Sequence, residues 1–247
     1  ISACLVGSEM CIRDRAIKES SRVLNIKGRV LPSTLGIVRL CARLEDGSVV
    51  EGESNISKSG QRIKEVFFDP PYAAPLAEVI AAIAEADAIV LGPGSLFTSI
   101  VPNLLVDRIA HAIAASPAVK IYVCNVMTQP GETDGMTASD HVKALIENAG
   151  AKICDYAIVN DEPPSKLREA YAKEGQISVT ADVDRIRELA VTPVRAQMIS
   201  ETVNVRHDPE KLGQQVLGVI DRAVAHRASY VKPAQPFGLR ASGEAKV

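Results

Sequence analysis

Two nearly continuous apolar runs, residues 88–91 (AIVL) and 119–124 (VKIYVC), constrain the fold of this chain more than any other feature. Neither run alternates between apolar and polar residues, so each is expected to form a strand covered on both faces, as in a parallel sheet. From about residue 76 onward, such runs alternate with amphipathic stretches, which is the pattern of strand–helix–strand crossover units. The sequence therefore predicts an α/β fold with a doubly wound, mostly parallel sheet.

The order of the expected elements supports this fold class. Helices are expected at residues 76–85, 103–115, 139–149, 166–172, 182–189 and 208–225. Strands are expected at residues 88–91, 119–124, 156–159, 177–179 and 194–198. Before them, two β-rich runs within residues 38–50 flank Asp46-Gly47, a dipeptide that supplies the positive φ of a tight hairpin turn. A third strand is expected at residues 63–68, so a β-hairpin lies on the N-terminal side of the parallel sheet.

The composition excludes several functional classes. The 247 residues are 47% hydrophobic, enough for a sizeable core in one large domain or two small ones. The formal net charge is -2 and there is no Trp, so neither a basic surface for nucleic acid nor aromatic stacking platforms are expected. No apolar run approaches the roughly 20 residues of a membrane span, and no secretory leader is recognisable, so a cytoplasmic location is expected.

The cysteines do not predict a zinc site or a disulfide framework, because no C-x-x-C pair occurs among them. They are Cys4, Cys11, Cys41, Cys124 and Cys154. Residues 1–15 (ISACLVGSEMCIRDR) share no periodicity with the adjoining residues and resemble translated sequencing-adapter sequence, so we expect a non-native leader. Residues 227–247 are rich in Pro, Gly, Ala and charged side chains, which predicts a disordered tail.

The loop after residues 88–91 is a candidate anion site. The first amides of a helix lack intrahelical partners and lie at the positive end of its dipole, and glycine allows phosphate oxygens to approach the backbone closely. The candidate binding residues are Gly92, Gly94, Ser95, Leu96, Thr98 and Ser99. The alternative is a plain connection with glycines kept for steric reasons. The spacing matches neither a dinucleotide fingerprint, a Walker loop nor a nucleophile elbow.

The loop after residues 119–124 is too long and polar to be a mere connector. Because it comes after the neighbouring strand, it is expected to face the first loop across the same sheet edge and to form one pocket with it. Its candidate ligand-binding residues are Asn125, Thr128, Gln129, Glu132 and Thr133. The amides suit a base or sugar edge, the hydroxyls suit a sugar, and Glu132 is expected to accept from sugar hydroxyls or to hold a divalent cation.

Other polar residues have structural interpretations beside functional ones. Ser139 and Asp140 are expected to cap a helix. His141 next to Asp140 suggests a catalytic dyad, but adjacency in sequence does not supply its geometry, and a satisfied surface or core histidine is favoured. Ser33 and Thr34 either line the pocket or belong to a turn, and the turn is favoured. The histidines show no metal-ligand spacing, so no metal site is assigned.

Six segments together resemble a known family in order and spacing. They are VLPST, DGSVVEGES, ADAIVLGPGSLFTSIVPNLLV, KIYVCNVMTQPGETDGMTASDHVKAL, IVN and RHDPEKL. From about residue 16 to 225 the chain resembles the gluconeogenesis factor family (YvcK-type) of the CofD-like superfamily. The resemblance implies a Rossmann-like fold, a cytoplasmic location, a role in cell shape during growth on gluconeogenic carbon sources, and binding of UDP-sugars such as UDP-N-acetylglucosamine.

The chain departs from this family at its N-terminal side. A first strand, a G-G-G-T-G-L turn and an acidic D-D-G-G region are missing, so the resemblance implies an incomplete domain at residues 16–226, with an exposed sheet edge and an uncovered apolar face. The main hypothesis is a nucleotide-sugar-binding regulatory protein with no assigned catalytic residue. The sequence leaves the oligomeric state open, with a homodimer as the default expectation.

Two alternatives remain open. The first is a CofD-type 2-phospho-L-lactate transferase acting on a deazaflavin, with a nucleotide-diphosphate donor and Mg²⁺, in which catalysis is mainly positioning and charge stabilisation. The second is a hydrolase with Ser95 as nucleophile, which ranks last because no elbow motif surrounds that serine.

Overall fold

The computed structural model of the chain describes residues 28–201 and 204–230, and side chains as far as residue 226. The expected leader at residues 1–15 and the expected tail from residue 231 onward lie outside this part. Three cysteines are within it, and all three are buried free thiols: Cys41, Cys124 and Cys154. Burial raises the pKa of Cys124 and of Cys154 to about 12, as is typical of small core residues.

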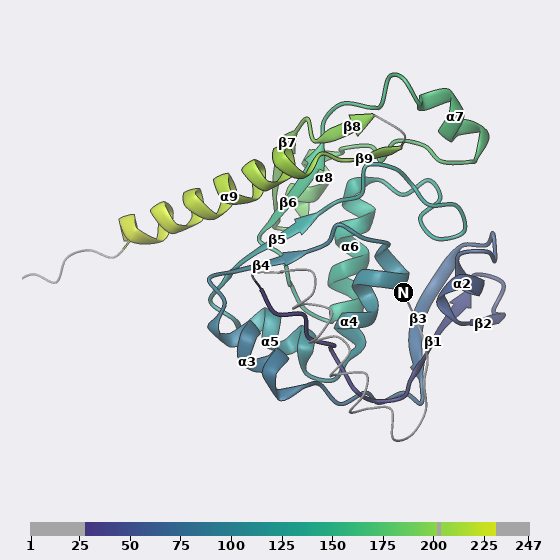
Figure 1. Cartoon of the computed structure of the whole chain (residues 1–247), viewed down its shortest axis with the longest axis horizontal. Helices are drawn as coiled ribbons and strands as arrows, with labels where there is room; N and C mark the ends of the chain where they lie inside the picture. Colours follow the sequence, from purple (N-terminus) through teal and green to yellow (C-terminus); the bar gives the residue numbers. More distant parts are fainter. Residues whose placement is uncertain (1–27, 202–203, 231–247) are drawn as a thin grey trace, which may run out of the picture.

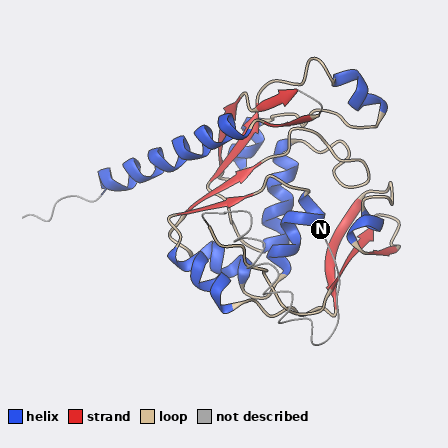
Figure 2. Ribbon diagram, viewed as in Figure 1, coloured by secondary structure: helices blue, strands red, loops and turns tan. Residues whose placement is uncertain are grey.

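A four-stranded parallel sheet forms the centre of the fold (Figure 2). In spatial order its strands are β4 (Ala88–Leu91), β5 (Val119–Val123), β6 (Tyr156–Asn160) and β7 (Thr192–Ala196). All three pairings are parallel, which confirms the predicted α/β class. Every residue of β5 is buried, as its apolar run predicts. The run of β4 was expected to be covered too, but Val90 is 42% exposed, because it lies on the face of α9, and α9 packs chiefly over β5 and β6.

Helices cover both faces of the sheet. The strand order follows the chain, so right-handed crossovers place the connecting helices on one face. These helices are α4 (Val101–Leu105), α5 (Ile109–Ala115), α6 (Ala138–Ala149) and α8 (Val183–Glu188). Helix α7 (Arg168–Lys173) belongs to the same series of connections but lies away from the sheet (Figure 1). The other face packs on α9 (Pro209–Tyr230), where Val219 and Ala223 join one apolar cluster with Ile121 and Ile158. Helix α9 extends well beyond the sheet (Figure 1).

The N-terminal part of the described chain is a small antiparallel sheet, ordered β2-β1-β3. Its elements are β1 (Arg39–Leu44), β2 (Val49–Glu51), the short helix α2 (Glu53–Ile56) and β3 (Ile63–Asp69). The predicted hairpin turn is present, with Gly47 at φ 85° and its amide donating to the Leu44 carbonyl at 2.9 Å. Helix α3 (Ala77–Glu85) then leads into the parallel sheet.

Several local predictions need correction. The helix expected at residues 103–115 is interrupted, because the chain turns sharply at Arg108, which has φ 63°. A π-helical turn, η1 (Leu96–Ile100), precedes α4. The strand expected at residues 177–179 is only an isolated bridge between Met127 and Ser178. A two-stranded antiparallel sheet, β8 (Ile199–Glu201) and β9 (Val205–His207), was not predicted. Helix α9 continues to Tyr230, five residues past its expected end, so residues 227–230, which were expected in the disordered tail, are helical.

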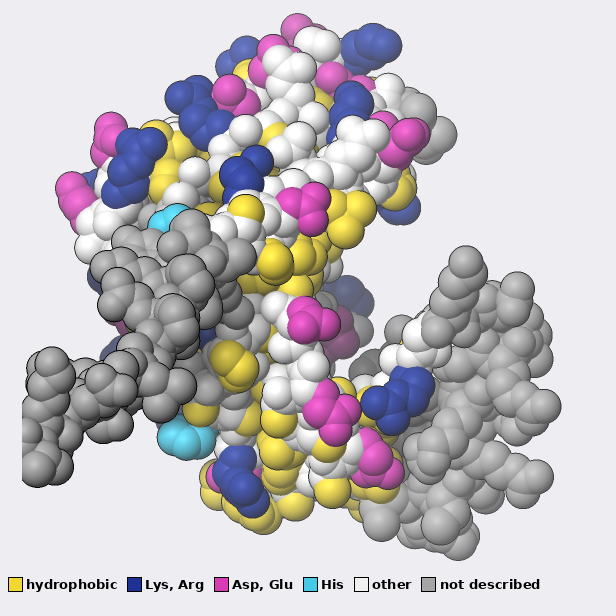
Figure 3. All heavy atoms as spheres, turned by 90° about the vertical axis from the view of Figure 1, so that its left-hand side faces the viewer, with side chains coloured by type: hydrophobic (Ala, Val, Ile, Leu, Met, Phe, Trp, Pro, Cys, Tyr) yellow, Lys and Arg dark blue, Asp and Glu magenta, His cyan; other side chains and the backbone are white. Residues whose placement is uncertain are grey.

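The surface and the helices give two further observations. In the space-filling view, hydrophobic side chains form a band between scattered charged groups on the face that is shown (Figure 3). Within the described ranges, no single helix is long and apolar enough to cross a membrane. The segments Leu96–Leu105 and Ile109–Ala115 pass that test only as a pair, with a bend of 83° between them.

Candidate functional site

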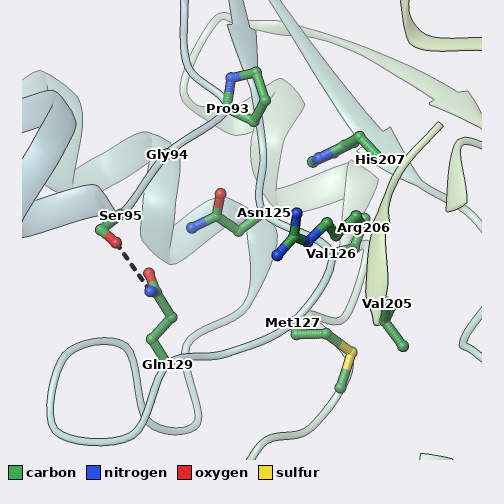
Figure 4. Close-up of a pocket in the computed structure, with 10 residues that line it drawn as sticks. All are labelled: Pro93, Gly94, Ser95, Asn125, Val126, Met127, Gln129, Val205, Arg206 and His207. Atoms are coloured by element: carbon green, nitrogen blue, oxygen red, sulfur yellow. Dashed lines mark hydrogen bonds between the residues drawn. The ribbon is translucent and has the colours of Figure 1, made fainter. Parts of the chain in front are cut away.

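A pocket of about 690 Å³ opens where β4 and β5 end. Its walls come from three places: the loop after β4, the loop after β5, and strand β9 (Figure 4). The lining residues are Pro93, Gly94, Ser95, Asn125, Val126, Met127, Gln129, Val205, Arg206 and His207. This volume lies within the range of about 300–1,000 Å³ that is usual for small-molecule sites.

The structure brings the two polar loops together. The Gln129 Nε2 amide donates to Ser95 Oγ at 2.9 Å, which ties the second loop to the first across the pocket. The amide oxygen of Gln129, Oε1, is buried and has no hydrogen-bond partner in the described part of the chain. An unpaired buried amide oxygen is costly, so this edge of the pocket can accept a hydrogen bond from a ligand.

The predicted ligand-binding residues divide into three groups. Four of them line the pocket: Gly94, Ser95, Asn125 and Gln129. Two others, Gly92 and Ser99, border a smaller adjacent pocket of about 350 Å³, which Gly94 also lines. The remaining five are buried: Leu96, Thr98, Thr128, Glu132 and Thr133. Burial of this last group means that its side chains support the loops rather than face the pocket.

Glu132 is the clearest case of such support. Its carboxylate accepts from the backbone amides of Phe97 and Thr98, at 2.7 and 3.1 Å, and from the Thr98 hydroxyl at 3.3 Å. The side chain is 2% exposed, and burial raises the pKa of Glu132 although the two amides oppose the shift. Sequence reasoning assigned the free amides at this helix start to a phosphate. In the structure, the protein's own carboxylate occupies them.

The two predicted threonines of the second loop have internal partners as well. Thr133 Oγ1 accepts from the backbone amide of Gln129 at 2.9 Å and so closes the turn. Thr128 Oγ1 accepts from the backbone amide of Ile177 at 3.0 Å and joins the loop to the segment after α7. Both hydroxyls therefore hold the loop in the shape that presents Asn125 and Gln129 to the pocket.

Sequence reasoning missed the residues that β9 contributes. Arg206 and His207 were visible only as part of RHDPEKL, and nothing in that segment indicates that it returns to the end of β5. The Arg206 guanidinium points into the pocket (Figure 4) and forms no ion pair or hydrogen bond with a described residue. Burial lowers the pKa of His207, so its ring is neutral at pH 7. The pocket thus contains one uncompensated cation.

Gly92 has to be glycine for two reasons. Its φ is +84°, and a Cβ there would lie 3.0 Å from the Val123 carbonyl oxygen at the end of β5. We expect Gly92→Ala to lower the free energy of unfolding by about 2 kcal/mol, measured by urea denaturation. Gly47→Ala is the matched control, because its φ is +85° but nothing lies near its Cβ. Equal losses in the two variants would contradict a steric role for Gly92.

The structure contains no catalytic dyad of Asp140 and His141, the interpretation that the sequence disfavoured. Thr137 is the N-cap of α6, and Asp140 completes a capping box by accepting from the Thr137 amide at 2.9 Å. His141 is fully buried, with Nδ1 2.8 Å from the Thr137 carbonyl oxygen. Ser139 is not the cap but donates its hydroxyl to Asp182 at 2.6 Å. These residues fasten the start of α6.

The burial of His141 leads to a prediction of how the stability of the protein depends on pH. Burial lowers its pKa below the ordinary value of 6.5, so as the pH falls the unfolded chain takes up the proton first. The contribution to stability is present above about pH 6.5 and is lost as the pH falls toward the lowered pKa. We expect His141→Gln to flatten the fall in unfolding free energy between about pH 7.5 and 5.5. His111 is exposed, and His111→Gln should leave the slope of unfolding free energy against pH as it is in the wild type. If the wild type and both variants had the same slope, the role of His141 would be contradicted.

The remaining candidates lie outside the pocket or lack a catalytic partner. Ser33 donates to Asn103 at 2.7 Å and Thr34 accepts from the Gly36 amide at 3.0 Å, as turn residues do. Ser95 Oγ accepts from Gln129, and no described histidine or carboxylate is bonded to it. Nothing in the described part of the chain therefore activates Ser95 as a nucleophile.

The described residues form no cluster of metal ligands. Across residues 28–201 and 204–230, no three His, Cys, Asp or Glu side chains are grouped so that they could hold a metal ion. Glu132 was expected to be available for such a role, but its Oε1 accepts from two backbone amides and its Oε2 from the Thr98 hydroxyl. The described side chains of the pocket therefore give magnesium no set of ligands.

Comparison with known proteins gives consistent matches. Residues 10–199 match the family model described as 2-phospho-L-lactate transferase CofD. The chain is 44% identical over 207 residues to the gluconeogenesis factor of Bacillus subtilis, a match that covers 83% of this chain and 65% of that relative. It is 46% identical over 205 residues to the gluconeogenesis factor of Halalkalibacterium halodurans, covering 82% and 64%.

Solved structures agree with these matches. A crystal structure of a protein from Bacillus halodurans superposes with a TM-score of 0.79 at 45% identity, covering 83% of this chain and 67% of that one. The chain spans slightly less than two thirds of the length of the two curated relatives.

Proposed function

The chain belongs to the gluconeogenesis factor family of CofD-like proteins, and from this membership and the pocket we propose that it binds a nucleotide sugar, such as UDP-N-acetylglucosamine, as a cytoplasmic regulatory protein. The observation that carries the proposal is the pocket itself. It combines a cation that has no partner among the described residues with hydrogen-bonding side chains and apolar side chains. Within the described residues it contains no nucleophile paired with a base.

Each part of the pocket suits one part of such a ligand. The Arg206 guanidinium presents a planar fork of donors that matches diphosphate oxygens. Asn125, Ser95 and Gln129 supply donors and acceptors for a base edge or sugar hydroxyls. The apolar lining that Val126 and Met127 contribute suits the face of a ring. In this proposal the Glu132 carboxylate is scaffold, and Arg206 takes over the role of anion binding that the sequence had assigned to the helix amides.

The cellular role follows from the family rather than from the pocket. The relatives are named gluconeogenesis factors, and we propose that this chain acts in the same process, including the regulation of cell shape during growth on gluconeogenic carbon sources. A regulatory protein of this kind binds its ligand without converting it to a product.

One observation favours a second candidate function. The family model that matches residues 10–199 is described by a transferase activity. A CofD-type 2-phospho-L-lactate transferase would use the same pocket for a nucleotide-diphosphate donor. Its catalysis would rest on positioning and charge stabilisation, for which Arg206 is the available cation among the described residues of the pocket.

Isothermal titration calorimetry on the chain separates these functions. We expect UDP-N-acetylglucosamine and UDP to bind and GDP to bind at least about tenfold more weakly. The UDP-sugar should be recovered unchanged after prolonged incubation. Preferential binding of GDP would favour the transferase. Absence of binding by all three nucleotides would contradict the proposed function.

A further inference from the structure

A second, more enclosed pocket of about 280 Å³ lies beneath α7. Its lining residues are Met127, Pro163, Arg168, Ala172, Gln176, Ile177 and Ser178. Met127 lines this pocket and also the larger one, so the two pockets share a wall. At this volume the second pocket falls just below the usual range for a whole small-molecule site, but it suits one part of a larger ligand.

Helix α7 is attached to the hairpin that carries Arg206. The Glu201 carboxylate on β8 accepts from three successive backbone amides, those of residues 165–167, at 2.7 to 3.1 Å. The Tyr171 hydroxyl accepts from the Val205 amide on β9 at 2.9 Å. Because both contacts join α7 to β8 and β9, the second pocket is held in a fixed position relative to Arg206.

The second pocket also contains an uncompensated cation. The Arg168 guanidinium forms no ion pair or hydrogen bond with any described residue. Ser178 adds a hydroxyl, whose one contact within the described chain is a weak one of 3.8 Å to the Met127 sulfur, and Gln176 adds an amide. These groups suit a hydroxylated group that carries its own negative charge, since a guanidinium pairs best with a carboxylate or a phosphate.

Building on the proposed function, on which this assignment rests, we propose that the second pocket receives the group attached to the nucleotide diphosphate, and that Arg168 makes an attached group bearing a carboxylate bind more tightly than an uncharged sugar such as N-acetylglucosamine, which also binds. With the diphosphate on Arg206, the attached group crosses Met127 and enters beneath α7. Arg168 is then a specificity-determining residue for the part of the ligand beyond the diphosphate.

Calorimetry with two sugar nucleotides tests this assignment. UDP-glucuronic acid and UDP-glucose differ only in a carboxylate that replaces a hydroxymethyl group. We expect UDP-glucuronic acid to bind about tenfold more tightly, the effect of one hydrogen-bonded charge pair. Arg168→Gln should abolish this preference and leave the affinity for UDP unchanged. Lys173→Gln removes a positive charge from the same helix, outside both pockets, and should keep the preference.

The outcomes distinguish the two proposals. If UDP binds but the two sugar nucleotides bind equally, or if the preference survives in Arg168→Gln, the assignment of the second pocket is wrong and the nucleotide site stands. If neither UDP nor a UDP-sugar binds, the proposed function fails and the assignment of the second pocket fails with it. Circular dichroism of both variants checks that the fold is unchanged, as expected for substitutions of exposed side chains.

Discussion

Glu132→Ala is expected to lower the free energy of unfolding by about 4 kcal/mol, because it leaves two buried amides without an acceptor, each hydrogen bond to a charged group being worth about 1.5–3 kcal/mol. The amides belong to Phe97 and Thr98, in the turn that opens the helical segment after β4. Solvent hardly reaches them, since Phe97 and Thr98 are themselves buried. Urea denaturation monitored by circular dichroism measures the loss.

Two further variants sharpen this test. Glu132→Gln keeps the shape and one acceptor oxygen, so we expect it to lose about half as much stability as the alanine variant. Glu147→Ala removes a carboxylate from a surface pair with Lys143 and should cost about 0.5 kcal/mol or less. A loss below about 1 kcal/mol in Glu132→Ala would show that the amides find another partner and would contradict the supporting role of Glu132.

Arg206→Gln is expected to weaken the binding of UDP about thirtyfold, equivalent to about 2 kcal/mol, because it removes the cation that the pocket offers to a diphosphate. Stability should hardly change, since the side chain is exposed and has no described partner. Calorimetry at two salt concentrations measures the effect, and the salt dependence of binding should decrease with the lost charge pair.

A matched substitution keeps this prediction specific. Arg185→Gln removes the same charge from α8, a helix that contributes no residue to either pocket, and should bind UDP as the wild type does. If Arg206→Gln bound UDP normally, the diphosphate would have to lie elsewhere. If both arginine variants were weakened equally, long-range charge rather than direct contact would explain the effect.

The parallel sheet was predictable because its signal is local. The run at residues 119–124 is apolar almost throughout, and β5 is correspondingly buried at every position. The hairpin turn at Asp46-Gly47 was predictable for the same reason, since Gly47 adopts the positive φ that the dipeptide favours. The predicted strand at residues 177–179 failed because its pairing with the loop after β5 stops at a single antiparallel bridge, between Met127 and Ser178.

The candidate site was predictable in outline and wrong in one central role. That the loops after β4 and β5 meet follows from the parallel sheet, whose strands all end at one edge. Gly94, Ser95, Asn125 and Gln129 accordingly line the pocket. The free amides before α4 were also a sound inference from helix physics. Whether a partner from elsewhere in the chain already occupies them depends on where Glu132 lies, and its spacing in sequence does not reveal that.

Sequence by itself determined the α/β class, the order of most elements and the pair of polar loops, because hydrophobic periodicity and turn chemistry act between near neighbours along the chain. Tertiary structure alone decided which anion satisfies the amides before α4, which cation the pocket holds, and which helix covers the second face of the sheet. Arg206 comes long after the second loop in the chain, and only the pairing of β8 with β9 brings it to the end of β5. Contacts between such distant segments depend on the packing of the whole fold, so no local pattern in the sequence encodes them.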